Sequence, residues 1–333
     1  MSSYHRLVRA KPSRTVLGTL FIVLATAFLA IAGFLLVTAA ATIAGRPDGP
    51  DEVPSFGELA DLALAFLMIA ALLPATLAAA RWVQHRPAGT LSSVTGRLRW
   101  RWLLRCLPVA AVAVVLLLAG GTAFAAATGV DAGLSDAELA GWGPFLLSMA
   151  VFVLVVPPQA AAEEYVMRGW LLQAVGSWCR GPWLPIGVQA VVFAALHGWG
   201  TPWGFADLVM FGLVAGWLTV RTGGLEAAIA LHVANNLISS VVAAALGDLG
   251  MDETAADMPW QFAVIDVPVL LAYAWVVVRL ARGAGVATES SVEPCDRVPP
   301  PRGPEAETGL ADHREDPQDS SNRHLSPSSS ARR

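Results

Sequence analysis

The chain has 333 residues, of which 55% are hydrophobic and only 14% are charged, and its formal net charge is −4. This composition argues against a pair of ordinary soluble domains, and the slightly acidic balance gives no indication of a nucleic-acid partner. The three cysteines, Cys106, Cys179 and Cys295, have neither metal-ligand spacing nor an evident disulfide partner.

Four uncharged runs dominate the first half of the chain, at residues 16–44, 62–80, 106–130 and 140–162. Each is long enough to cross roughly 30 Å of hydrocarbon as a helix. Their apolar residues are continuous rather than alternating, which favours membrane helices over a closed β-barrel. The first run is longer than a signal-peptide core of about 7–15 residues, so we expect it to be retained as a span.

The whole pattern predicts an all-α, polytopic membrane helix bundle with about eight transmembrane helices. The predicted spans are 16–44, 58–80, 104–128, 143–166, 183–199, 204–221, 224–246 and 260–280. We divide the chain into an N-terminal segment (1–15), three helices within 16–130, a core of five helices within 140–282, and a tail (283–333). The tail is rich in Pro, Ser, Asp and Glu, and we expect it to be disordered and cytoplasmic.

Basic residues alternate from one connection to the next. They gather in residues 1–15, in 81–101 and after the fourth, sixth and eighth spans, whereas the other connections are biased toward acidic residues. Because Lys and Arg favour the cytoplasmic side, both termini and every even-numbered connection are predicted to be cytoplasmic. We therefore expect a multi-pass protein of a cell membrane. Its content of Ala, Arg, Gly and Trp is typical of a GC-rich bacterial genome.

The stretch QAAAEEYVMRGW (159–170) places charged side chains at the end of the fourth predicted span. Ionisable residues within a span cost roughly 2.5–3.5 kcal/mol at a helix centre, so they indicate function. Glu164 and Arg168 are four residues apart and can pair along one face. Glu163 points about 100° away. We expect it to have no partner on its own helix and to face a cavity. The alternative is a helix end that emerges into water.

A second polar residue, His197, lies four residues after Phe193 near the end of the fifth predicted span. On a straight helix counted from Pro182 it would lie about 22 Å along, nearer the outside than Glu163. For the two side chains to meet, the fifth helix would have to be tilted or to begin well below the membrane plane. Alternatively, the histidine belongs to an interfacial aromatic belt with the nearby Trp199.

The third polar group, His232, Asn235 and Asn236, lies about 13 Å into the seventh predicted span, judged by helix rise. His232 and Asn236 are four residues apart and share one face, whereas Asn235 lies one position round. At this depth the side chains either serve a reaction or act only as hydrogen-bond links between helices.

Together these groups supply the parts for peptide-bond hydrolysis without a covalent intermediate. A glutamate can take a proton from water as a general base while a histidine orients that water. A second histidine and an amide can donate hydrogen bonds to the oxyanion that develops on the attacked carbonyl.

Three short motifs follow in order on successive predicted helices: E-E-x-x-x-R at 163–168, F-x-x-x-H at 193–197 and H-x-x-x-N at 232–236. Over roughly 144–245, the sequence resembles the CAAX-prenyl-protease-type intramembrane endopeptidases, the CPBP or Abi family. The resemblance implies an eight-helix bundle with a cavity open toward the cytoplasmic side. It also implies that Glu163 is the general base and His197 its partner, and that His232 and Asn236 stabilise the oxyanion.

In the same resemblance, Glu164 and Arg168 are supporting members of the first motif. Glu163, His197 and His232 could in principle bind zinc and leave a position open for water. However, the H-E-x-x-H spacing of zinc proteases is absent, and a glutamate-activated water needs no metal. We therefore expect no metal and no other cofactor.

The expected function is an intramembrane endopeptidase that cleaves near the C-terminus of a membrane-associated or lipidated protein or peptide. Its expected partners are membrane lipid and that substrate. Two alternatives stay open: a non-catalytic membrane scaffold or bacteriocin-immunity-type module of the same fold, and a proton-coupled transporter. A transporter is disfavoured because the polar residues gather in the C-terminal half, without the two related halves that transporters often show.

Overall fold

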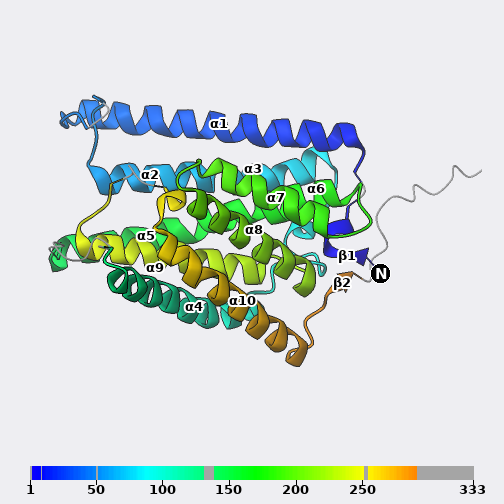
Figure 1. Cartoon of the computed structure of the whole chain (residues 1–333). Helices are drawn as coiled ribbons and strands as arrows, with labels where there is room; N and C mark the ends of the chain where they lie inside the picture. Colours follow the sequence, from blue (N-terminus) through cyan, green and yellow to red (C-terminus); the bar gives the residue numbers. More distant parts are fainter. Residues whose placement is uncertain (1, 9, 50–51, 131–138, 251–253, 291–333) are drawn as a thin grey trace, which may run out of the picture. The chain divides into compact units, whose positions relative to one another are not determined.

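The computed structural model describes residues 2–8, 10–49, 52–130, 139–250 and 254–290, all within one compact unit. Most of the predicted disordered tail, from residue 291 onward and including Cys295, lies outside the described residues. The described chain is almost entirely helical, as Figure 1 shows, and the all-α prediction is confirmed.

The α-helices are, in chain order, α1 (Pro12–Ile43), α2 (Glu58–Ala70), α3 (Leu72–Ala78), α4 (Trp100–Ala127), α5 (Trp142–Glu164), α6 (Leu172–Gly176), α7 (Trp183–Leu196), α8 (Pro202–Thr222), α9 (Glu226–Leu246) and α10 (Trp260–Gly283). Two π-helical segments, η2 (Ala79–Val83) and η4 (Tyr165–Leu171), continue α3 and α5. Seven helical runs in the described chain are long and apolar enough to cross a membrane. The protein is therefore a multi-pass membrane protein.

The fifth predicted span, 183–199, is shorter than expected. It corresponds to α7, which has only 14 residues and is not among the seven long runs. The helix ends at Leu196 because Gly198 and Gly200 adopt positive φ angles of 94° and 39°. Such a backbone is accessible to glycine and incompatible with a continuing right-handed helix.

The fourth predicted span is longer than expected. We predicted that it ends at residue 166, but α5, η4 and α6 form one continuous helical run, Trp142–Gly176, of 35 residues. Glu163, Glu164 and Arg168 therefore lie inside a helix and not at its end. Glu164 and Arg168 are fully buried, so the alternative of an end that emerges into water is wrong for these two residues.

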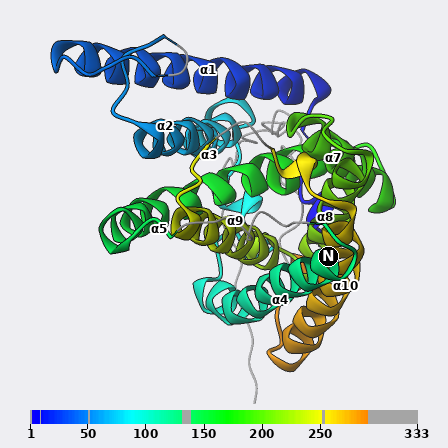
Figure 2. The same ribbon diagram turned by 60° about the vertical axis from the view of Figure 1, so that its left-hand side comes forward.

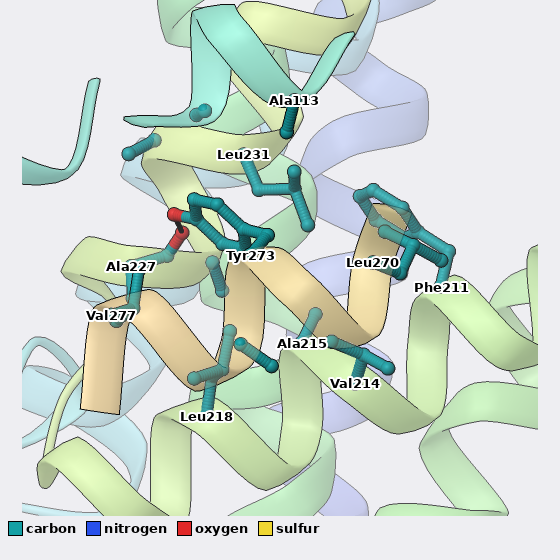
Figure 3. Packing of buried hydrophobic residues seen from close by; sticks show 14 of the residues in the cluster. Ala113, Phe211, Val214, Ala215, Leu218, Ala227, Leu231, Leu270, Tyr273 and Val277 are labelled. Carbon is teal, nitrogen blue, oxygen red and sulfur yellow. Dashed lines mark hydrogen bonds between the residues drawn. The ribbon is translucent and has the colours of Figure 1, made fainter. Parts of the chain in front are cut away.

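The helices differ in how deeply they are buried. α1 lies at the edge beside α2, as Figures 1 and 2 both show, and only 6% of its span-forming window is buried. α4, α8, α9 and α10 surround the largest apolar core, which includes Phe211, Leu231, Leu270 and Tyr273 (Figure 3). The Tyr273 hydroxyl donates a hydrogen bond to the Ala227 carbonyl at 2.7 Å, which joins α10 to the first turn of α9.

A buried ion pair fixes the start of α9, six residues before His232. Glu226, at the first position of α9, is fully buried, and its two carboxylate oxygens accept from Arg99 at 2.8 and 2.6 Å. The backbone of the 92–94 loop adds hydrogen bonds to the α8–α9 turn, where Gly223 adopts a φ of 70°. Since Arg99 directly precedes α4, this pair ties the start of α4 to the start of α9, the helix that carries His232.

The first and last described residues form one short antiparallel pair of strands. Ser2–Ser3 (β1) pairs with Glu289–Ser290 (β2), which follow α10 after a short connection. The composition change at residue 283 predicts disorder from that point, but residues 284–290 are part of the folded unit.

Close packing of α7 on α8 depends on a glycine. A β-carbon added at Gly212 would lie 2.7 Å from Ala190 Cα and 2.8 Å from Ala190 Cβ. The buried Gln189 side chain bridges the two helices at this point by donating to the Gly212 carbonyl at 2.8 Å. This close contact between α7 and α8 bears on the site because α7 carries His197 at its end.

We expect Gly212→Ala to destabilise the protein by about 1–3 kcal/mol, because the added methyl group overpacks the α7–α8 contact. Gly187→Ala, on α7, is the matched control, since a β-carbon there meets nothing within 4 Å. The control should be neutral or stabilise by up to about 1 kcal/mol. Thermal unfolding of both purified variants in detergent measures the difference, and equal transition temperatures would contradict the proposed contact.

Candidate active site

The first motif lies where one long helix changes its winding. α5 contains Pro157 and Pro158, which lack backbone N–H donors, and it passes into the π-helical segment η4 directly after Glu164. Single π-helical turns inside α-helices are frequent at functional sites, because they rotate side chains away from their regular α-helical positions. The segment 159–168 is therefore locally irregular where its charged residues face the bundle.

Glu164 is the centre of a buried charge cluster. Its Oε1 accepts from Arg168 Nη1 at 2.8 Å and from His232 Nδ1 at 2.8 Å. The Glu164 and Arg168 side chains are 0% exposed and that of His232 is 4% exposed. The predicted pairing of Glu164 with Arg168 along one helix is confirmed. The link to His232 on α9 was not predicted, and it joins the first motif to the third.

Two phenylalanines complete the surroundings of this cluster. The Arg168 guanidinium lies 4.3 Å from the ring centre of Phe193 and 5.7 Å from that of Phe211. Both rings also contact His232 edge-on, with centroids 5.8 and 5.5 Å away. Arg168 Nε and Nη2 have no hydrogen-bond partner among the described residues, so these π-faces stabilise the buried cation instead.

Glu163 faces a different group from its neighbour. Its Oε2 lies 4.0 Å from His197 Nε2 and 3.7 Å from His232 Nε2, both longer than a hydrogen bond. The Glu163 and His197 side chains are 14% and 25% exposed, so this part of the cluster is more open than the part around Glu164. The structure thus brings together residues from α5, α7 and α9 that are far apart in sequence.

Hydrogen bonds decide which nitrogen of each histidine carries a proton. His197 Nδ1 lies 2.8 Å from the Phe193 carbonyl, which can only accept, so Nδ1 is protonated. His232 Nδ1 is protonated for the same reason, because it faces the Glu164 carboxylate. Among the described residues neither Nε2 atom makes a hydrogen bond, and both lie within 4.0 Å of Glu163 Oε2. The phenylalanine of the F-x-x-x-H motif therefore contributes its carbonyl as well as its ring.

Our expectation that Glu163 has no partner on its own helix is wrong. Gln159 Nε2 donates to Glu163 Oε1 at 2.7 Å, and Gln159 Oε1 accepts from Asn236 Nδ2 at 3.1 Å. Gln159 is 3% exposed, and it links the predicted base to the predicted oxyanion donor. The spacing of four residues before Glu163 was the available signal, because a helical amide at that distance can reach a carboxylate.

The depth problem posed for His197 disappears for two reasons. The helix that carries Glu163 continues 13 residues beyond it to Gly176, which corresponds to about 20 Å. α7 begins at Trp183 and stops at His197, which is its C-cap, after about 21 Å. Glu163 thus lies about as far before the end of its helix as His197 lies after the start of α7. The short connection 177–182 joins those two ends, so no unusual start of α7 is needed.

In the ranges that the structure describes, the other polar side chains of the predicted spans form no hydrogen bond with Glu163 or Glu164. Asn235 Nδ2 donates to Asn236 Oδ1 at 3.3 Å and so extends the amide chain that starts at Gln159. Asp207 and Asp266, on α8 and α10, are neighbours that are each 5% exposed, and neither belongs to the three motifs. Cys106 and Cys179 are free thiols.

A metal site is not formed by these side chains as they are arranged. Across the residues that the structure describes, no group of three or more His, Cys, Asp or Glu side chains could hold a metal ion. That includes the possible zinc set of Glu163, His197 and His232.

Comparison with known proteins agrees with the motifs. Residues 142–238 match a family model described as type II CAAX prenyl endopeptidase Rce1-like. A curated relative, the uncharacterized protein YyaK of Bacillus subtilis (strain 168), is 27% identical over 193 residues, which cover 56% of this chain and 62% of the relative. The match thus spans less than two thirds of the relative's own length. No solved structure matches the chain.

The matched segment runs from the first residue of α5 into the second half of α9 and includes all three motifs. The resemblance predicted from those motifs is confirmed, and the relative from Bacillus agrees with the predicted bacterial source. Residues 142–238 carry the fold of a CAAX-type intramembrane protease and resemble the Rce1-like group of the CPBP family, within a chain that is a multi-pass membrane protein.

Proposed function

We propose that this protein is an intramembrane endopeptidase in which the Glu163 carboxylate activates a water molecule. The observation that carries the proposal is the arrangement of acceptors. Glu163 Oε2 faces the unprotonated Nε2 of His197 at 4.0 Å. Two acceptors face each other favourably only when a donor lies between them, and water supplies two O–H groups for this purpose.

The charges of the cluster support a different role for His232, namely that of a hydrogen-bond donor. Glu163 and Glu164 bring two negative charges, and Arg168 brings one positive charge. In the proposed reactive form His232 carries a second proton on Nε2, so that two cationic side chains face the two carboxylates. Its Nδ1–H remains on Glu164 Oε1, and its Nε2–H is then a donor directed toward the site.

Each chemical step uses a group already in place. Glu163 takes a proton from water as the water oxygen bonds to the carbonyl carbon of the substrate. The oxyanion that forms accepts from His232 Nε2–H and from the second Nδ2–H of Asn236, whose first N–H is held by Gln159. The carbon–nitrogen bond then breaks, and the proton on Glu163 passes to the leaving amine.

The proposed substrate is a membrane-associated or lipidated protein or peptide that is cleaved near its C-terminus. Two findings support this class: the site lies within membrane-spanning helices, and the matching family model is described as a CAAX prenyl endopeptidase. We propose that the substrate enters from the side that the basic connections predict to be cytoplasmic. A probe follows from this class, namely a farnesylated peptide that ends in a CAAX sequence and carries a fluorophore and quencher.

Replacement of the base tests the mechanism. We expect Glu163→Gln to lower kcat on the farnesylated probe by about 10²–10⁴-fold, because the amide cannot take a proton from water. Asp266→Asn is the matched control, since it neutralises a buried carboxyl in a span outside the cluster, and it should keep kcat within about twofold of the parent. A Glu163→Gln enzyme as fast as the parent protein would show that Glu163 is not the base.

The absence of a catalytic metal is tested separately. We expect prolonged dialysis against 1,10-phenanthroline to leave the cleavage rate unchanged, since water activation by Glu163 needs no Lewis acid. Elemental analysis of the purified protein should find much less than one zinc per chain. One equivalent of zinc, lost together with activity on dialysis and restored with it, would replace this mechanism with a zinc-dependent one.

The role of Gln159 is tested through rate and stability together. Gln159→Leu removes the donor to Glu163 and the acceptor for Asn236, so we expect kcat to fall about 10–100-fold, as for other residues that hold catalytic groups in place. Gln261→Leu, which removes a buried amide bonded to Thr128, is the control. Both variants should lose about 1–3 kcal/mol of unfolding free energy, but only Gln159→Leu should lose kcat. Equal kcat losses would mean that Gln159 is merely structural.

A further inference from the structure

Two cavities adjoin each other at the ends of α8 and α10, and none of their lining residues belongs to the three motifs. The larger has a volume of about 490 Å³ and lies between the start of α7 and the faces of α8 and α10. The smaller has a volume of about 150 Å³ and lies beyond the last turns of α8 and α10. Val278 and Arg282 line both, so the two cavities are adjacent, and together they are called the depression.

The larger cavity is an apolar groove with aromatic walls. Trp183, Trp217 and Trp275 line it, and Trp183 and Trp275 remain 68% and 61% exposed. Its α10 wall runs from Leu271 to Arg282, which corresponds to about 16 Å of helix. Its volume falls within the range of about 300–1,000 Å³ that is usual for ligand pockets.

The groove ends in positive charge. Arg279 lies at this end with its guanidinium 5.1 Å from the Trp275 ring centre. Arg282 and Arg221 line the smaller cavity, and neither side chain has a hydrogen bond or an ion pair within the described part of the chain. Two unpaired guanidinium groups beside one small cavity match a phosphate, which accepts the forked hydrogen bonds of arginine.

We propose that this depression binds one anionic glycerophospholipid, with an acyl chain in the groove and the headgroup phosphate at Arg221 and Arg282. The basic ends of α8 and α10 lie on the side that the arginine-rich connections predict to be cytoplasmic, where membranes carry anionic lipid. Basic pockets between membrane helices on that side are a known setting for anionic headgroups. A soluble anion would leave the apolar groove empty, and a neutral lipid would leave both guanidinium groups unpaired.

The test is native mass spectrometry of the full chain in detergent micelles, titrated with phosphatidylglycerol or with phosphatidylcholine of the same acyl chains. The parent protein should bind phosphatidylglycerol at least about tenfold more tightly. Each arginine beside an anionic headgroup strengthens binding about fivefold. The Arg221→Gln/Arg282→Gln double variant should therefore bind it about 30-fold more weakly, with phosphatidylcholine unchanged.

Arg81→Gln/Arg105→Gln is the matched control, because both arginines are exposed near helix ends and line neither cavity. The control should bind phosphatidylglycerol like the parent protein. If it loses affinity as the double variant does, the preference is a general effect of basic charge and the proposed site is wrong. Competition by soluble glycerol 3-phosphate as strong as by the lipid would contradict the groove. Displacement by the farnesylated peptide at equal affinity would assign the groove to substrate.

Discussion

One carboxylate oxygen, Glu164 Oε1, joins the helices on which the site depends. It accepts from Arg168 on its own helical run and from His232 on α9, all in a setting without solvent. Loss of Arg168 would leave the buried Glu164 carboxylate without its ion-pair partner, which is far more costly than a surface ion pair is worth. Since Glu163 directly precedes Glu164, the same contact fixes where the proposed base points. The rest of the site is arranged around this shared oxygen.

The chemistry-bearing residues could be predicted from the sequence because each is expensive inside a membrane. Glu163, His197 and His232 differ from the apolar residues around them, and the structure brings all three together. The i, i+4 pairing of Glu164 with Arg168 needed only helical geometry. Gln159 was missed because a single uncharged amide in a span gives little signal until its two ends are seen to bridge Glu163 and Asn236.

Most spans could also be predicted, since long apolar runs have few alternatives in lipid. The lengths of the fourth and fifth spans could not be predicted, because hydropathy does not show where a helix stops. The charged residues of 163–168 continue a helix that is stabilised by packing inside the bundle, whereas two glycines end α7 early. The Arg99–Glu226 pair was likewise hidden, because it joins residues more than a hundred positions apart and depends on the tertiary fold.

The shortness of α7 has a consequence for the surrounding bilayer. Its 14 residues cover only about 21 Å, compared with roughly 30 Å of hydrocarbon. Beside this helix the protein presents a hydrophobic mismatch, which a membrane relieves by local thinning or by drawing headgroups inward. Trp183 and Trp199 lie near its two ends and are largely exposed, as expected of residues that sit at headgroup level. We expect the bilayer to be thin beside α7, which would shorten the path of water to the site at the helix end that carries His197.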